Sequence, residues 1–215
     1  MGTITPKIAI EHGVGMVHQE FMLVNELTVL ENIILGFEPK KGLTIDFDKA
    51  RKEVKKYIEQ YHMDVQLDKK VSQISVGEAQ RVEIIKTLMR GADIIILDEP
   101  TAALTRNESE KLYTLVDKLK ENGVSIIFIS HRFEDMYRLA SRVTVFRDSQ
   151  YIGTYDVDGI TNADLIKAMV GREINDLFPK PEVKFGDEML RIEHLSRIGF
   201  FKDVSFNVHA GEIVG

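Results

Sequence analysis

Short apolar runs alternate with amphipathic stretches along the first half of the chain. Runs that predict strands lie at 13–19 (GVGMVHQ), 93–98 and 124–130. The run at 93–98 shows no alternation of apolar and polar positions, which is typical of a strand buried on both faces of a parallel sheet. Strands that alternate with helices predict an α/β fold with right-handed crossovers between parallel strands.

Helix-capping side chains mark where the intervening helices begin. The pattern Ser/Thr-x-x-Glu is typical of a helix N-terminus, because both side chains accept hydrogen bonds from amides that have no partner inside the helix. It occurs at Thr28, Ser75 and Thr105, while Asp46 and Thr161 are caps of two further helices. The predicted helices span 28–36, 46–61, 75–91, 105–123, 133–140 and 161–171.

The second half of the chain changes in character. RVTVFR and YIGTYD, on either side of Asp148 and Ser149, predict a β-hairpin. The proline-containing, charged segment after 171 predicts a linker, and two strand-like stretches follow it. We therefore divide the chain into a first domain at 1–171, a linker at 172–187 and the start of a second domain at 188–215. Within the first domain, residues 20–90 are predicted to form a helical subdomain beside the sheet.

Composition restricts the class of protein. The 215 residues are 44% hydrophobic and 29% charged, with a formal net charge of -6. These values are typical of a globular protein, and the acidic balance argues against nucleic acid as the main partner. The absence of cysteine excludes disulfides and thiolate metal sites. The longest apolar runs are four residues, whereas a membrane helix needs about 20, and the first residues lack a signal core, so we expect a cytosolic chain.

The stretch IIILDEPT carries the strongest chemical signal. Four apolar residues lead directly into Asp98 and Glu99. At the end of a buried strand, an aspartate can hold a magnesium ion through water, and a neighbouring glutamate can polarise an attacking water. Two solvated acids at the start of a loop are the alternative. The apolar run before the pair and the Pro-Thr after it favour the chemical interpretation.

Three weaker polar signals accompany the acidic pair. Ser75 and Gly77 open a helix, whose N-terminus attracts anions, although the same residues also suit a simple helix cap. Gln19 follows the first strand and His131 the third. Either side chain could contact phosphate or be an ordinary loop residue. The spacing of the other histidines indicates no metal site.

Together and in this order, the four signals resemble the ATP-binding cassette of ABC transporters. The acidic strand resembles the Walker B motif, TAAL (101–104) resembles the D-loop, and SVGE (75–78) resembles the signature, which reads SGGQ in most members. The stretches SVGEAQRVEIIKTL and GMVHQEFMLV are closest to those of simple-sugar and nucleoside importers in this family, and the resemblance extends over residues 8–215.

The resemblance implies a fold and an activity. The fold would be a P-loop-NTPase-like α/β cassette with a mostly parallel core sheet and an inserted helical subdomain. The intact protein would be the ATPase subunit of an importer, at the cytoplasmic face of the membrane. Transmembrane permease subunits would dock on the helical subdomain, and the chain would contact neither nucleic acid nor the transported solute.

The resemblance also implies roles for single residues, with ATP and Mg²⁺ as cofactors. Gln19 and Asp98 would contact Mg²⁺, and Gln19 would also contact the attacking water. Glu99 would be the catalytic base, and His131 would contact the terminal phosphate. The signature residues would bind a nucleotide held by an opposing cassette; they are Ser75, Val76, Gly77 and Glu78.

One motif of such ATPases is not in the sequence. The 215 residues contain no G-x-x-x-x-G-K-[ST], the loop that surrounds the phosphates. The resemblance implies that the sequence runs from just after one phosphate loop to just before that of a second cassette in the same protein, and that it is inactive alone. The strand before the missing loop would lie between 125–130 and 142–146. Two outcomes remain open for the tail strand 212–215, which are insertion at those two free edges, in its own chain or in a neighbouring copy, and a disordered tail.

Two functions of other classes remain open at this point. One is a soluble tandem-cassette ATPase that acts on ribosomes or DNA. A basic linker would favour this function, but PKPEVK (179–184) is short and mixed in charge. The other is a non-catalytic module that uses only its docking surface, which a nucleotide-binding measurement would distinguish.

Overall fold

The chain forms two units. The computed structural model describes residues 5–171 and 185–214. Contacts between residues divide the chain into Met1–Gly171 and Arg172–Gly215. Most of the predicted linker, at 172–184, lies outside the described residues. All the candidate residues of the sequence analysis are in the first unit.

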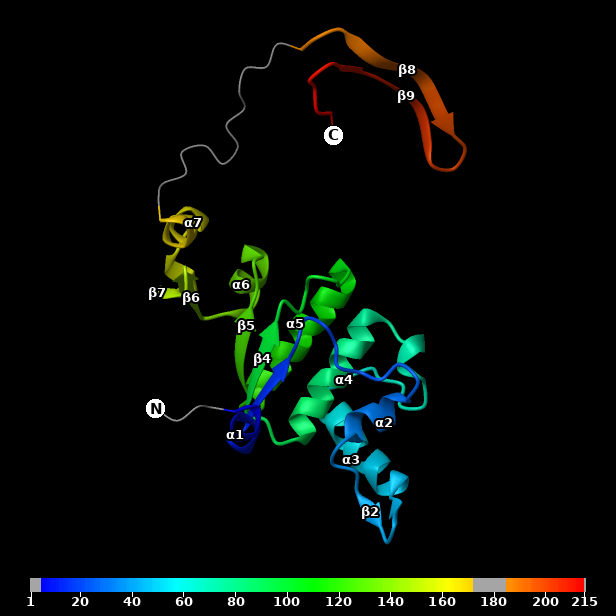
Figure 1. The fold of residues 1–215 in the computed structure, drawn as a ribbon, viewed down its shortest axis with the longest axis vertical. Helices are drawn as coiled ribbons and strands as arrows, with labels where there is room; N and C mark the ends of the chain where they lie inside the picture. Colours follow the sequence, from blue (N-terminus) through cyan, green and yellow to red (C-terminus); the bar gives the residue numbers. More distant parts are fainter. Residues whose placement is uncertain (1–4, 172–184, 215) are drawn as a thin grey trace. The chain divides into compact units, whose positions relative to one another are not determined.

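A parallel three-stranded sheet is at the centre of the first unit (Figure 1). Its strands are β1 (Val14–Val17), β4 (Ile94–Asp98) and β5 (Ser125–Ile129), in the order β1-β4-β5. Leu97 pairs with Val17 on one side and with Phe128 on the other. The predicted α/β fold with a parallel core is therefore confirmed.

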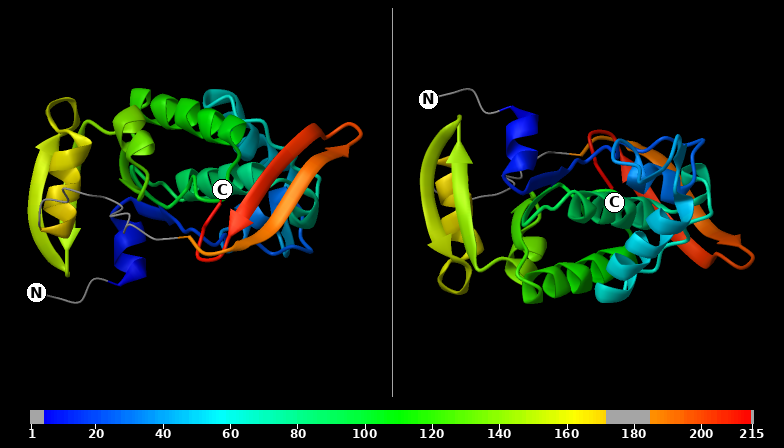
Figure 2. Two further views of the ribbon diagram at one scale, coloured as in Figure 1. Left: turned by 90° about the horizontal axis from the view of Figure 1, so that it is seen from above. Right: turned by 90° about the horizontal axis from the view of Figure 1, so that it is seen from below.

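One face of this sheet is covered and the other is not. Ile95 and Leu97 of β4 are fully buried on the face where α4 (Val76–Met89) and α5 (Arg106–Glu121) lie (Figures 1 and 2). On the opposite face Ile127 and Ile129 of β5 are 51% and 45% exposed. The predicted burial of 93–98 on both faces was therefore wrong for one face, because Ile94, Ile96 and Asp98 of β4 are only partly buried.

Helix α4 is the central helix of the predicted helical subdomain. Helices α2 (Val29–Ile34) and α3 (Phe47–Gln60) pack against it on the side away from the sheet. Nine of its fourteen residues are buried, which suits a helix with neighbours on several sides. Within residues 5–171 and 185–214, no helix is long and apolar enough to span a membrane.

The capping signals in the sequence located the helices correctly. At Thr28, Ser75 and Thr105 both hydrogen bonds of the capping box are present. The structure adds elements that the pattern did not predict. These are helix α1 (Pro6–Glu11), the short hairpin of β2 (Lys40–Lys41) and β3 (Thr44–Ile45), and the 3-10 turn η1 (Val71–Gln73).

The rest of the first unit follows β5. Helix α6 (Phe133–Leu139) leads to a hairpin of β6 (Arg142–Arg147) and β7 (Gln150–Asp156), as predicted, with Asp148 and Ser149 at φ of 51° and 62°. Positive φ at both turn residues is the conformation that tight hairpins require. The 3-10 turn η2 (Val157–Gly159) and helix α7 (Asn162–Val170) complete the unit.

The second unit is an antiparallel pair, β8 (Glu188–Arg197) and β9 (Phe201–His209). The predicted tail strand is not formed in the described part of the tail, since residues 212–214 have no strand conformation and Gly215 lies outside it. Glu212 instead accepts a hydrogen bond from the His209 amide at 2.8 Å, which turns the chain back on itself after β9. Residues 212–214 therefore give no support to an inserted strand within this chain, and insertion into a neighbouring copy stays a prediction.

Gly15 allows the close approach of β1 and α4, and its replacement tests this packing. A Cβ at Gly15 would stand 2.1 Å from Cγ2 of Thr87, so Gly15→Ala must displace β1 or α4. We expect a loss of about 1–3 kcal/mol in the free energy of unfolding, measured by urea denaturation. Gly159→Ala is the control, because a Cβ there meets nothing within 4 Å. Equal stability of the two variants would contradict the packing.

Candidate functional site

The parallel sheet brings four candidate residues to one edge. Strands β1, β4 and β5 run in the same direction, so their carboxyl ends lie side by side. Gln19 follows β1, Asp98 ends β4 with Glu99 next to it, and His131 follows β5. Ligands of open parallel sheets bind outside the carboxyl ends of the strands. The strand topology therefore places the residues that follow these three strands at one edge of the sheet.

Glu99 and His131 are in direct contact. Nδ1 of His131 lies 2.7 Å from Oε2 of Glu99. The Glu99 side chain is 23% exposed and that of His131 is 70% exposed, so both can be reached from solvent. Glu99 has a φ of 48°, and its amide donates to the carbonyl of Ile129 at 2.9 Å. A left-handed glutamate costs about 1–3 kcal/mol and is found at functional sites held by their surroundings.

Asp98 and Gln19 offer oxygen atoms suited to a hard cation. Asp98 pairs with Ile129 in the register of the sheet and is partly exposed, and Gln19 is exposed. A carboxylate and an amide carbonyl are ligands that Mg²⁺ accepts, with water and phosphate oxygens completing its octahedron. The donor set therefore fits Mg²⁺. Residues 5–171 and 185–214 contain no group of three or more His, Cys, Asp or Glu that could hold a metal.

The signature-like segment lies at the N-terminus of α4. The Ser75 hydroxyl accepts from the Glu78 amide at 3.2 Å, and the Glu78 carboxylate accepts from the Ser75 amide at 3.1 Å. Val76 is 43% exposed. Within residues 5–171 and 185–214, no hydrogen bond joins these residues to Glu99 or His131, so they form a second group, whose role stays a prediction.

Gly77 has a close neighbour from α5. It is buried, and a Cβ there would stand 2.8 Å from Oε1 of Glu108. Hydrogen bonds from the amide and hydroxyl of Thr105, joined by weaker ones from Ser75 and Gly77, hold the pKa of Glu108 below its usual range. Glycine at position 77 thus makes room for a carboxylate of the same chain.

A buried carboxylate that the sequence analysis missed contacts the loop that follows Asp98 and Glu99. Asp135 in α6 is fully buried. It accepts hydrogen bonds from Thr101 at 2.5 Å, from Ser130 at 3.0 Å and from the hydroxyl of Tyr113. Gln80 of α4 was also missed, and it donates to the Pro100 carbonyl at 3.0 Å. Asp135 lies in a helix with other charged residues, so the sequence does not distinguish it from a solvated side chain.

Burial changes the titration of Tyr113. Loss of hydration and the hydrogen bond to the Asp135 carboxylate raise the pKa of Tyr113 from 10.0 to about 12. Both causes penalise the phenolate, so the neutral hydroxyl is kept as a donor at neutral pH.

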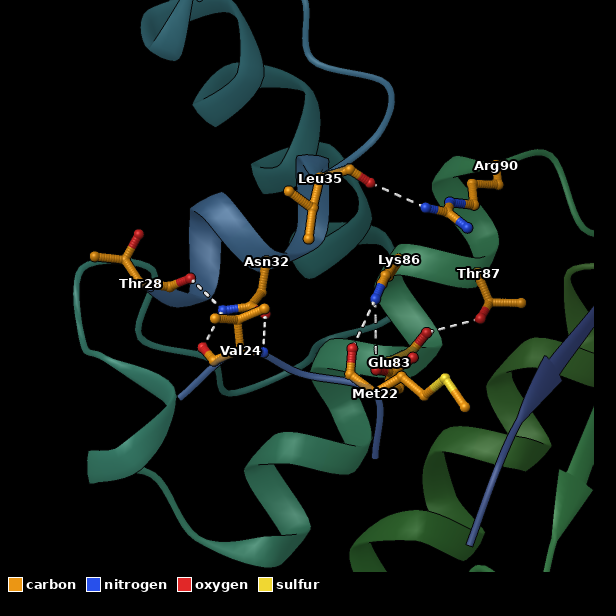
Figure 3. Close-up of polar contacts among 9 residues, drawn as sticks. All are labelled: Met22, Val24, Thr28, Asn32, Leu35, Glu83, Lys86, Thr87 and Arg90. Atoms are coloured by element: carbon orange, nitrogen blue, oxygen red, sulfur yellow. Dashed lines mark hydrogen bonds and ion pairs between the residues drawn. The ribbon is translucent and has the colours of Figure 1, made fainter. Parts of the chain in front are cut away.

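Side chains of α2 and α4 fix the loop that follows Gln19 (Figure 3). Asn32 is fully buried; its amide group donates to the Val24 carbonyl at 3.0 Å, and its oxygen accepts from the Val24 amide at 2.7 Å. Lys86 donates to the Met22 carbonyl at 3.3 Å and lies 3.6 Å from Glu83. This loop therefore has a defined conformation set by the helical subdomain.

Two cavities lie away from these residues. One of about 600 Å³ is lined by β7, η2 and α7, and one of about 250 Å³ lies where the end of α3 meets α4 and α5. Arg81, Lys111 and Lys118 line the smaller cavity. Neither includes the carboxyl edge of the sheet, which is where the chemically suited side chains meet, so we assign the candidate site to that edge.

Part of the chain matches a known family. Residues 3–102 match the family described as ABC transporter. The match includes the Gln19 loop, the SVGE segment and the acidic pair, the features on which the resemblance in the sequence rested.

Several curated proteins that are similar to this chain are named as import proteins. Over 212 residues, 98% of the chain, it is 40% identical to the ribose import ATP-binding protein of Geobacillus kaustophilus, of which it covers 43%. It is 43% identical over 203 residues, 94% of the chain, to the ribose import ATP-binding protein of Rubrobacter xylanophilus, covering 41% of it. The galactose/methyl galactoside import ATP-binding protein of Salmonella typhimurium is 40% identical over 211 residues, 97% of the chain and 42% of that protein. The chain thus spans about two fifths of the length of these relatives.

Solved structures confirm the fold. An ATP-binding cassette of an ABC transporter in its ADP conformation aligns with a TM-score of 0.61 at 22% identity, covering 78% of this chain and 72% of that one. A dimeric bacterial ABC transporter cassette aligns with a TM-score of 0.59 at 25% identity, covering 74% and 69%. The predicted P-loop-NTPase-like cassette fold is therefore correct.

Tyr113→Phe tests the buried cluster through its pH dependence. The variant loses a hydrogen bond to a carboxylate, and we expect a loss of about 1.5–3 kcal/mol in the free energy of unfolding at neutral pH. Because the folded protein keeps the Tyr113 proton that the unfolded chain loses above its pKa of 10.0, wild-type stability falls as the pH rises from 10.0 towards about 12. Tyr113→Phe has no phenol to titrate and so keeps its stability over this pH range. The difference in the free energy of unfolding between wild type and variant therefore becomes smaller as the pH rises.

Urea unfolding from about pH 8 to about pH 11 measures this difference. Tyr151→Phe, in which an exposed hydroxyl of β7 is removed, is the control and should give no such trend. A difference between Tyr113→Phe and wild type that stays constant over the whole range would contradict the assignment.

Proposed function

We propose that this chain is part of the ATP-hydrolysing subunit of an importer for simple sugars. The observation that carries the proposal is the contact of Glu99 with His131, at 2.7 Å, where the parallel strands end. The import proteins for ribose and galactose among the relatives support a sugar as the solute, and their names do not mention nucleosides. Which sugar is carried depends on other subunits, since we propose that this subunit does not touch the solute.

In the proposed mechanism the chain positions and deprotonates a water. Glu99 accepts a proton from a water that attacks the terminal phosphate of ATP, and His131 donates a hydrogen bond to that phosphate. Asp98 and Gln19 would hold Mg²⁺, which when bound offsets negative charge on the phosphate oxygens. Residues 75–78 would contact a nucleotide on an opposing cassette. We propose that the 215 residues alone are inactive, because they contain no phosphate-loop motif.

The proposed partners are the permease subunits, and the proposed place is the cytoplasmic face of the membrane. The fixed loop after Gln19 and the end of α2 expose apolar side chains, with Met22 70%, Val24 39% and Leu35 40% exposed. Exposed apolar residues on a rigid loop are suited to a protein interface. Residues 188–215 would begin a second cassette in the same polypeptide, and we propose no nucleic-acid partner for a chain of net charge -6.

Glu99→Gln tests the base. In the full-length protein we expect kcat for ATP hydrolysis to fall by about 100-fold or more, because the amide keeps the shape of the side chain but cannot accept the proton. The KM for ATP should change little, since the substitution removes an interaction of the transition state rather than of the bound substrate. A phosphate-release assay under steady-state conditions gives both constants.

The matched control for this variant is Glu121→Gln, which makes the same chemical change at an exposed position at the end of α5. It should hydrolyse ATP at the wild-type rate. Wild-type kcat in Glu99→Gln would show that another group is the base, and no hydrolysis by the full-length wild-type protein would contradict the proposed function itself.

A further inference from the structure

We propose that Asp135 is a positioning residue that keeps Glu99 and His131 in contact. The inference rests on the proposed function for its catalytic meaning, whereas the structural claim stands on the hydrogen bonds alone. Asp135 itself lies on α6, and its hydrogen bonds go to Thr101, Ser130 and Tyr113 rather than to either of the two residues. It acts through the segments that carry them.

The hydrogen bonds of Asp135 reach both segments. Thr101, which donates at 2.5 Å, is two residues after Glu99 on the loop that leaves β4. Ser130, which donates at 3.0 Å, is the residue immediately before His131 on the loop that leaves β5. One carboxylate thus fixes the position of the acidic loop relative to the histidine loop.

The centre of the cluster is buried and Ser130 is partly exposed at its edge, so water has little access to the Asp135 carboxylate. Asp135 is 0% exposed and Thr101 1%. The third donor is the hydroxyl of Tyr113 on α5, which also packs against the guanidinium of Arg138. Ser130 is held from a second side, because its hydroxyl accepts from the Arg132 amide at 3.0 Å. A buried polar network whose members are all satisfied gives its segments a single arrangement.

A carboxylate suits this position better than an amide of the same shape. Two oxygens without protons can accept all three hydroxyl bonds. In Asp135→Asn one oxygen is replaced by an NH₂ group, which cannot accept, so at least one hydroxyl must turn away. The variant keeps the volume of the side chain, and it should loosen one loop relative to the other without opening a cavity.

The first experiment observes the contact directly in this chain. The ring-nitrogen NMR signals of His131 are compared in wild type, in Glu99→Ala, which removes the contact, and in Asp135→Asn. We expect Asp135→Asn to move these signals at least half of the way to their position in Glu99→Ala. The double variant of Glu99→Ala and Asp135→Asn should give His131 signals at the same position as Glu99→Ala alone, because both changes act on the same contact.

Two internal controls separate positioning from a general loss of stability. Thr101→Val and Thr87→Val make the same chemical change, since each threonine is buried and each hydroxyl donates one hydrogen bond, to Asp135 and to the Glu83 carbonyl respectively. Only Thr101→Val should move the His131 signals. Those of His194, which lies 2.6 Å from Asp203 in the second unit, should stay in place in every variant.

The second experiment measures catalysis in the full-length protein. We expect kcat for ATP hydrolysis to fall by about tenfold or more in Asp135→Asn with KM within about twofold, because small displacements of catalytic groups slow the chemical step. If the wild-type protein does not hydrolyse ATP, the proposed function is wrong, and the NMR comparison still decides the positioning role.

His131 signals that stay at their wild-type position in folded Asp135→Asn would overturn the proposal. If Asp135→Asn does not fold, Thr101→Val and Ser130→Ala decide in its place, since each removes a single hydroxyl from the cluster. A shift in both supports the positioning role. Unchanged signals in both would mean that the cluster only stabilises the fold.

Discussion

The parallel pairing of β4 with β1 on one side and β5 on the other determines where the chemistry of this chain can take place. Because the three strands run in one direction, the residues that follow them gather at one edge. A shift of one residue in the register of β4 would move Asp98 and Glu99 away from the histidine loop. The buried Ile95 and Leu97 oppose such a shift, since both would leave the core face.

Hydrogen bonds from three elements then fix the loop after β4. The Glu99 amide donates to β5, the Pro100 carbonyl accepts from Gln80 of α4, and the Thr101 hydroxyl donates to Asp135 of α6. Net hydrogen bonds contribute about 1 kcal/mol each, which together offset the strain of about 1–3 kcal/mol in a left-handed glutamate. The glutamate is thus held in an unusual backbone conformation by structure that is itself well anchored.

Local signals in the sequence were sufficient for most elements of the fold. A capping box acts within four residues, so Ser75 and Thr105 mark helix starts without any tertiary information. The acidic pair and His131 were found because each follows an apolar run. Asp135 was missed, because its partners come from three other elements and the spacing of residues along the chain carries no sign of them.

The predictions that the structure does not support also have physical explanations. An apolar run such as the one that forms β5 indicates a strand but does not report how many of its faces are covered, and Ile127 and Ile129 remain half exposed. For the short tail after β9, extension as a strand was one of two outcomes left open. The carboxylate of Glu212 instead accepts a hydrogen bond from the His209 amide, a local contact that forms between residues three positions apart.

We propose that the carboxyl edge of the sheet holds the phosphates and the metal. Paramagnetic broadening of amide NMR signals by Mn²⁺ with ATP, in the full-length protein and against a sample with Mn²⁺ alone, tests it most directly. We expect the amide signals of Gln19, Asp98 and His131 to broaden in the sample with Mn²⁺ and ATP and to stay sharp in the sample with Mn²⁺ alone. Broadening centred instead on the basic cavity lined by Arg81 and Lys111, with no change at the sheet edge, would contradict it.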